Sequence, residues 1–383
     1  MYLKSLLAVA VASVSVSASA LELSGINTAS GLLVTPTVTF NRLHNDNWKE
    51  DSSIQGSWVT SLAPSVEVLA ERGLNYYSLN VSANRENYSA NSGANNTDYT
   101  VSAAGHMEFS KRSRLDLNLS KTSDEDNSAS LPEDFESTTY GVTYGYGAEA
   151  AAMQLEFAYN RTDKRYDLTN YDGKESDVSG FTTTAYYKVG GFTKALVEYR
   201  YNSFDYVSLN TLDSKSNGLL AGVTWDMTGK TTGSLKVGSA KKDFSDASIA
   251  DRTTTIWETG ITWNPKEYST ITFDASTSVG EGSGGSAETY IDSESVRVGW
   301  IHSWNDRVST DLNFTRLKED YKGCSTASNC HNDETDTLAL DVTYAFRPQV
   351  DFTAGVGRKD KSSTSSTSAF DANTYYVGVV AGF

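Results

Sequence analysis

The segment TYYVGVVAGF, residues 374–383, divides its side chains into two rows. Successive side chains of a β-strand point to opposite faces, so alternate residues of this segment share a face. One face carries only apolar and aromatic side chains: Tyr375, Val377, Val379, Ala381 and Phe383. A strand with one lipid-compatible face is typical of bacterial outer-membrane barrels. We interpret these five residues as the signal that the barrel insertion machinery binds, which makes that machinery an expected partner.

The same two-faced pattern recurs along the chain in segments of roughly ten residues. In residues 115–120, for example, three leucines alternate with Asp116, Asn118 and Ser120. Short turns and longer polar loops alternate between these segments, which is the asymmetry of periplasmic turns and extracellular loops. The sequence therefore predicts an all-β fold, a transmembrane antiparallel up-and-down β-barrel of about 18 strands. Sixteen strands is the alternative count, because Pro64 could mark either a bulge or an extra turn.

Aromatic side chains gather at one end of alternate segments. They lie just before or within short turns, at Tyr146, Trp225, Trp263, Trp300, Trp304, Tyr344 and Phe346. Tyrosine and tryptophan rings are favoured at the level of lipid headgroups. The pattern predicts an aromatic girdle at the periplasmic membrane boundary.

The first residues predict the compartment. Lys4 precedes an apolar stretch at residues 6–16, and Ala18-Ser19-Ala20 has the small-residue pattern of a signal-peptidase site. We expect residues 1–20 to be a signal peptide and residues 21–383 to be the barrel. The predicted location is the cell outer membrane, with outer-membrane lipid and lipopolysaccharide as partners.

Composition agrees with a barrel better than with a soluble core. Hydrophobic residues make up 38% of the chain, and the mean hydropathy is −0.41. A water-lined barrel needs apolar side chains on only one face of each strand, so this content is sufficient for it. The formal net charge is −16, which makes a nucleic-acid partner unfavourable. We therefore expect no nucleic acid to bind.

Two cysteines, Cys324 and Cys330, lie in one polar loop. In an oxidising compartment a pair at this spacing favours a disulfide that closes a small loop. A metal site is the alternative, because His331 follows directly, but this loop offers no clear fourth ligand. The sequence favours the disulfide and predicts no metal site.

Charged residues of both signs fall on the polar faces of the predicted strands. We expect them to face the lumen, at Glu156, Lys188, Lys194, Glu198, Arg200, Lys236, Glu258, Asp274, Arg297, Asp341 and Asp351. They could line a polar passage for hydrated solutes, since a barrel of this size leaves an aqueous channel. They could equally form ion pairs that brace the wall.

An enzymatic function is not expected. His106 and Glu108 share a strand face and could form an acid–base pair, but they lie near the short-turn end. His331 adjoins a cysteine, and the two other histidines, His44 and His302, have no evident catalytic neighbours. The sequence predicts no catalytic residues and no cofactor.

The first predicted hairpins resemble the putative beta-barrel porin 2 family. The resemblance is carried by residues 33–36 (Leu-Val-Thr-Pro), by Asp46-Asn47 in a polar loop, and by strands that include residues 66–68 and 76–88. It extends loosely over the mature chain. The resemblance implies an outer-membrane barrel that works with exopolysaccharide or capsule export systems, and therefore implies export components as partners. The alternatives are a general diffusion porin for small hydrophilic solutes and an occluded structural or adhesive barrel.

Overall fold

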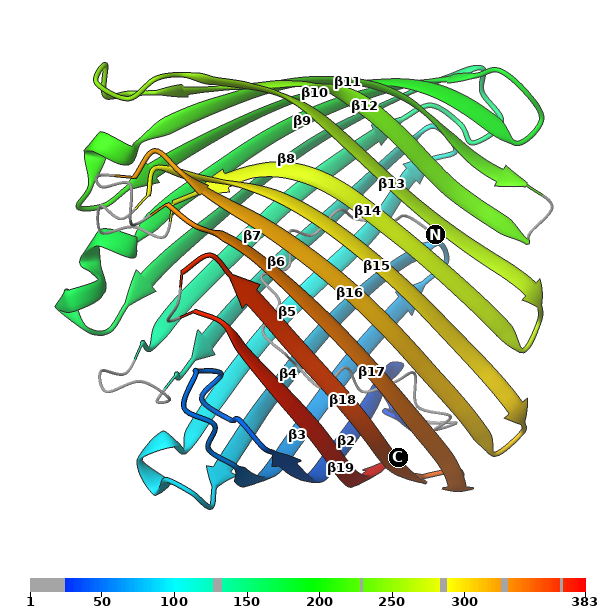
Figure 1. The fold of residues 1–383 in the computed structure, drawn as a ribbon. Helices are drawn as coiled ribbons and strands as arrows, with labels where there is room; N and C mark the ends of the chain where they lie inside the picture. Colours follow the sequence, from blue (N-terminus) through cyan, green and yellow to red (C-terminus); the bar gives the residue numbers. More distant parts are fainter. Residues whose placement is uncertain (1–24, 127–132, 228–229, 283–287, 325–329, 366–367) are drawn as a thin grey trace.

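A computed structural model describes residues 25–126, 133–227, 230–282, 288–324, 330–365 and 368–383. The predicted signal peptide, residues 1–20, lies outside these ranges. Figure 1 shows one sheet of tilted strands that closes on itself, with a short extra strand beside it. The predicted barrel fold is confirmed.

The wall consists of β2 to β19, eighteen antiparallel strands in sequence order. The first ten strands of the chain are β1 (Ile26–Asn27), β2 (Leu32–Asn45), β3 (Ser57–Arg72), β4 (Asn75–Tyr88), β5 (Asn96–Ser110), β6 (Ser113–Asp124), β7 (Phe135–Tyr146), β8 (Met153–Tyr166), β9 (Ser176–Lys188) and β10 (Thr193–Tyr206). The others are β11 (Ser214–Met227), β12 (Thr231–Phe244), β13 (Arg252–Lys266), β14 (Ser269–Glu281), β15 (Tyr290–Asn305), β16 (Val308–Lys322), β17 (Asn332–Arg347), β18 (Val350–Ser363) and β19 (Phe370–Gly382).

The barrel closes where β19 pairs with β2. The register runs from Thr374 opposite Asn45 to Gly382 opposite Thr37, so the backbone groups of both edge strands are paired along this seam. The short strand β1 also pairs with β2, beyond the end of β19. The backbone N–H of Gly25 donates to the carbonyl oxygen of Phe383 at 3.1 Å. The segment before β2 thus continues the line of the last strand.

Pro64 lies within β3 and makes neither an extra turn nor a register shift. On one side it pairs with Val38 of β2. On the other side the ladder to β4 lacks the pairs at residues 63 and 64 and resumes in the same register at Ser65. Proline has no N–H to donate, so a local interruption of the ladder is the expected result. The alternative count of 16 strands is wrong, and the count of 18 is confirmed.

Long connections gather at the left of Figure 1 and short turns at the opposite end. Three of the long connections contain short 3-10 helices: η1 (Ser92–Ala94), η2 (Thr169–Lys174) and η3 (Asn210–Leu212). Among the short turns, the one after β3 contains Gly73 at a φ of +65°, a left-handed conformation that glycine adopts without strain. No helix in the described part of the chain has the length and apolarity to cross a bilayer.

Large apolar side chains cover the outer face of the wall. On β17 they occupy every second position and are 37% to 49% exposed: Leu338, Leu340, Val342, Tyr344 and Phe346. Residues that pair across neighbouring strands share a face, so this pattern can be followed around the barrel. The apolar belt ends toward the long connections at Phe40, Phe314 and Val356. The next outward residue on each of these three strands is an arginine: Arg42, Arg316 or Arg358.

Candidate functional site

The candidate site is the inner face of the barrel together with its mouth on the side of the long connections. The register assigns all eleven sequence-predicted lumen residues to the inner face: Glu156, Lys188, Lys194, Glu198, Arg200, Lys236, Glu258, Asp274, Arg297, Asp341 and Asp351. Asp274 pairs directly with Arg297 across β14 and β15. Lys194, the register partner of Lys188, donates to Gln154 Oε1 at 2.9 Å, and the others belong to ion-paired groups or to an acidic region.

Four inner-face charges form one network across β10, β12 and β13. The Lys236 ammonium lies 2.8 Å from Glu198 Oε2 and 2.8 Å from Glu258 Oε1. The guanidinium of Arg200 lies 2.9 Å from Glu258 Oε1 and also contacts Glu198. Such a closed group of two bases and two acids balances its own charge. It braces the wall more than it attracts a solute.

Two glycines of β11 flank the network, since Gly218 pairs with Arg200 and Gly222 pairs with Lys236. A Cβ on Gly222 would overlap the Leu235 carbonyl oxygen and would lie 2.9 Å from Lys236 Cα. The clash with backbone atoms shows how sharply the wall bends at β11 and β12, which form the upper edge of the barrel in Figure 1. Glycine at this position therefore permits the bend.

The same arrangement recurs elsewhere on the inner wall. Arg114 of β6 extends over Gly145 of β7 to reach Glu156 of β8, with Nη2 and Oε2 3.5 Å apart. Asp341 of β17 accepts a hydrogen bond of 2.7 Å from the hydroxyl of Tyr376. A Cβ on the intervening Gly355 would overlap both side chains. Long polar side chains thus lie along the wall instead of projecting toward the barrel axis.

Eight neighbouring strands of the eighteen-stranded wall lack bases over most of their described inner-face positions. From β19 through β2 to β5, the described inner-face positions contain no lysine or arginine. On β16, β17 and β18 the inner-face lysines Lys359 and Lys361 lie only near the long connections. Acids are plentiful on these eight strands: Glu67, Glu71, Glu86, Asp98, Glu108, Asp311, Glu319, Asp333, Asp341 and Asp351. The lumen therefore has one acidic side, while the bases are concentrated on β6 to β15.

At the mouth, the ends of β14 and β15 lie inside the wall. The ladder between β13 and β14 stops at Glu258 and Ser276, and Figure 1 shows β14 leaving the edge of β13. Alternation assigns Glu281 to the outer face, yet it forms an ion pair with Lys242, an inner-face residue of β12. The Tyr206 hydroxyl of β10 donates to the Gly282 carbonyl oxygen at 3.1 Å. These contacts place this hairpin end against the inner face of β10 to β12, which narrows the entrance.

The connection between β2 and β3 also folds over the entrance. Glu50 Oε2 lies 2.5 Å from the ammonium of Lys359, an inner-face residue of β18. The ring of Trp48 is only 7% exposed and packs against Tyr88 of β4, with ring centroids 5.1 Å apart. Asn47 is fully buried and donates through its side-chain amide to the Asp371 carbonyl oxygen at 2.9 Å. This loop is therefore anchored to three parts of the mouth.

Aromatic rings lie in pairs around the entrance. Besides Trp48 and Tyr88, the rings of Phe135 and Tyr166 are 5.6 Å apart, and Tyr171 follows at 5.6 Å from Tyr166. Inner-face residue Tyr321 stacks on His331, with centroids 4.0 Å apart. Aromatic faces in a wet cleft can bind the apolar faces of ring-shaped ligands.

The remaining sequence-predicted groups lie apart from these contacts. Cys324 and Cys330 form a disulfide with an S–S distance of 2.08 Å and Cα atoms 5.5 Å apart. His106 Nδ1 is 2.7 Å from Asp116 Oδ1, and its Nε2 is 3.7 Å from Glu108 Oε1, near the short-turn end. The described residues contain no cluster of three or more metal-ligating side chains. The row from Tyr375 to Phe383 faces outward.

Sequence periodicity assigns the charged residues to the inner or outer face of the wall, but it does not predict which of them contact one another. The four-residue network joins strands that are one to three apart in the wall, which periodicity along a single strand does not encode. Glycines on polar strand faces, such as Gly222 and Gly355, were the available signal. Nothing in the sequence predicted that the ends of β14 and β15 lie inside the wall, because alternation assigns Lys242 and Glu281 to opposite faces.

Comparisons with known proteins agree with this architecture. The sequence model of the putative beta-barrel porin 2 family matches residues 22–383 of this chain. A crystal structure of OpdK from Pseudomonas aeruginosa with vanillate is similar at a TM-score of 0.51 and 11% identity, covering 91% of this chain and 99% of that one. OccAB2 from Acinetobacter baumannii gives 0.50 and 10% identity, covering 94% and 99%. At such identities the likeness shows the fold alone. No curated protein matched the sequence.

Proposed function

Since the chain belongs to the putative beta-barrel porin 2 family, we propose that this outer-membrane porin-like barrel is a passive channel that favours hydrated cations over anions. The acidic side of the lumen, from β16 through β19 to β5, carries this proposal. Its acids include Asp311 and Asp341 near the short turns, where the inner faces of β16 to β18 have no lysine or arginine among their described residues.

The bases on the opposite wall offset only part of the field of these carboxylates, because several of them are held by acids on their own side. Arg200 and Lys236 are held by Glu198 and Glu258, and Lys242 is held by Glu281. Charges in a confined pore with low-dielectric walls act over a Debye length of roughly 8–10 Å at physiological salt. The excess of acids over bases on this side therefore concentrates cations in the passage, as rings of acidic side chains do in cation channels.

A planar-bilayer experiment tests this function. The purified protein is inserted into a bilayer under a KCl gradient, and the reversal potential gives the ratio of K⁺ to Cl⁻ permeability. The wild type should conduct with a ratio above one. The double variant Asp311→Asn/Asp341→Asn should keep its conductance with a ratio closer to one. Asp360→Asn, on the outer face, is the matched control and should leave the ratio unchanged.

Each outcome has a separate meaning. A barrel that inserts but never conducts would contradict the channel and favour the occluded structural barrel. A conducting barrel with a ratio at or below one would contradict the cation preference while leaving a general diffusion porin. An equal change in the control variant would show that the overall charge of the protein, not its lumen, sets the ratio.

Export of an exopolysaccharide is the second candidate function, implied by the family resemblance of the first hairpins. The aromatic rings of the entrance support it, because the half-buried rings of Phe135 and Tyr166 are of the kind that stacks on the apolar face of a sugar. Deletion of the gene should then reduce secreted polysaccharide, and the substitution Tyr166→Ala should reproduce part of that loss. Normal secretion with slower uptake of small solutes would favour the diffusion porin instead.

A further inference from the structure

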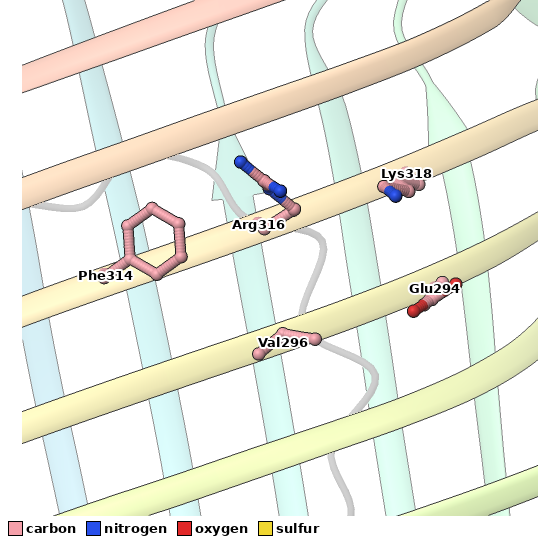
Figure 2. Close-up of a pocket in the computed structure, with 5 residues that line it drawn as sticks. All are labelled: Glu294, Val296, Phe314, Arg316 and Lys318. Atoms are coloured by element: carbon pink, nitrogen blue, oxygen red, sulfur yellow. The ribbon is translucent and has the colours of Figure 1, made fainter.

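Two cavities open on the lipid-facing surface of the barrel. The first, of about 350 Å³, lies between β15 and β16. Figure 2 shows its lining, with Phe314, Arg316 and Lys318 along one strand and Glu294 and Val296 on the next. The second, of about 380 Å³, spans the seam where the barrel closes. Both combine apolar side chains with an arginine at the edge of the apolar belt that faces the long connections.

The seam cavity is largely an apolar groove. Its floor and sides come from β17, β18 and β19: Leu340, Val342, Ala354, Val356 and Val377. The small side chain of Ala354 leaves the depression between larger neighbours. On the side of the long connections it is bounded by Arg42 and Trp58. The groove therefore lies within the belt that acyl chains surround, and a cation stands at its headgroup end.

The charge of Arg42 is not balanced by a neighbouring acid. Its guanidinium donates to the Thr60 hydroxyl and lies 5.2 Å from the centre of the Trp58 ring. Within the described residues, no aspartate or glutamate forms an ion pair with it. Its neighbours on the outer face are aromatic instead: His44 stacks on Tyr375, with centroids 4.8 Å apart. A guanidinium at the membrane boundary without a carboxylate favours an anionic ligand.

The first cavity lacks this property. Arg316 makes two hydrogen bonds to Asp336, at 2.7 and 2.6 Å, and Lys318 lies 3.5 Å from Glu334. Glu294 adds another negative charge to the lining. A phosphate would meet an acidic surface there. The contrast between two cavities of similar size singles out the one at the seam.

We propose that the seam groove binds a phosphorylated lipid of the outer leaflet, with an acyl chain along Val342, Ala354 and Val377 and a phosphate against Arg42. Two observations support this occupant: the positive charge of Arg42 complements a phosphate, and Arg42 lies at the edge of the belt that faces the long connections. Arg42 belongs to β2 and Val377 to β19, and the two are register partners across the closing seam. A lipid bound here contacts both strands, so its binding stabilises barrel closure.

Native mass spectrometry tests the site. The delipidated protein in detergent is titrated with purified lipopolysaccharide and with the same lipopolysaccharide after removal of its phosphates. The variants are Arg42→Gln, the matched control Arg316→Gln at the other cavity, and Ala354→Leu, which fills the groove. The wild type and Arg316→Gln should bind the phosphorylated lipid equally. Arg42→Gln should bind the phosphorylated lipid roughly tenfold more weakly than the wild type does. The wild type should bind the dephosphorylated lipid more weakly than the phosphorylated one by a similar factor.

The same titration separates the alternatives. Equal binding by the wild type and Arg42→Gln would overturn the proposal, as would an equal loss in the two arginine variants. If Ala354→Leu binds as well as the wild type, the acyl chain does not lie in this groove. Competition by inorganic phosphate alone would show an anion site without lipid. Each variant is first checked for heat-dependent mobility on gels, which reports a closed barrel independently of lipid.

Discussion

Asp46 and Asn373 lie 327 positions apart in the sequence and hold each other by three hydrogen bonds. The Asp46 carboxylate accepts from the backbone N–H of Asn373 at 2.7 Å and from its side-chain amide at 2.8 Å. The Asp46 N–H in turn donates to the Asn373 carbonyl oxygen at 3.1 Å. This reciprocal contact ties the loop after β2 to β19 at the mouth end of the closing seam.

The contact should depend on pH. The hydrogen bond from the Asn373 backbone N–H holds the pKa of the Asp46 carboxyl below its ordinary value of 3.8. A depressed pKa means that the stabilisation is fully present above 3.8 and is lost as pH falls through the lower folded value. Asp46→Asn should cost about 1 kcal/mol at neutral pH and remove this acid-dependent part of unfolding. Urea titrations of the refolded wild type and variant at pH 7 and pH 3 measure the free energy of unfolding at each pH, with Asp360→Asn as control.

Alanine at Gly222 should destabilise the barrel far more than alanine at Gly191. The added Cβ at Gly222 meets backbone atoms of β12, whereas at Gly191 it meets nothing within 4 Å. We expect a loss of about 1–3 kcal/mol or more for Gly222→Ala, because the backbone must shift. Urea unfolding of the refolded variants measures the difference. Equal midpoints for the two variants would contradict the sharp bend at β11 and β12.

Separating Lys242 from Glu281 should release the hairpin end from the inner wall. The Lys242 side chain is 2% exposed, so removing one partner leaves a buried charge and costs about 3–5 kcal/mol. Single-channel recordings of Lys242→Met should show a larger or noisier conductance than the wild type. The double variant Lys242→Met/Glu281→Gln should be more stable than either single one. Unchanged recordings would mean that the hairpin end does not limit the entrance.

The orientation of the barrel predicts the accessibility of the disulfide. After mild reduction, Cys324 and Cys330 should react with a membrane-impermeant maleimide on intact cells, because their loop lies on the side of the long connections. A chain with both cysteines changed to serine and with Glu149→Cys in a short turn is the matched control. It should react only after the outer membrane is opened. The reverse pattern would invert the predicted topology.

Strand alternation was sufficient to predict the barrel and the two faces of its wall below the mouth. It worked because a transmembrane wall has only two environments, and Leu340 and Asp341 differ in which one they can occupy. The strand count was ambiguous only at Pro64, since a missing N–H has the same sequence signature in a turn and in an interrupted ladder.

The mouth could not be predicted in the same way. The ion pair of Lys242 and Glu281 joins residues that alternation assigns to opposite faces, and it exists because β14 leaves β13 above Ser276. The bend of a strand away from its neighbour depends on the tilt and closure of the entire sheet. The anchoring of Glu50 to Lys359 likewise joins positions 309 residues apart, which local patterns do not encode.

The side chains that lie across glycines affect the width of the passage and therefore the current that ions would carry through it. Arg114 on Gly145 and Tyr376 on Gly355 are fastened to neighbouring strands, so they have few alternative rotamers to sample. Away from the entrance, which the end of the β14–β15 hairpin narrows, the diameter of the passage is then set by the sheet and not by thermal side-chain motion. Open-channel current through such a rigid tube should be quiet and nearly ohmic.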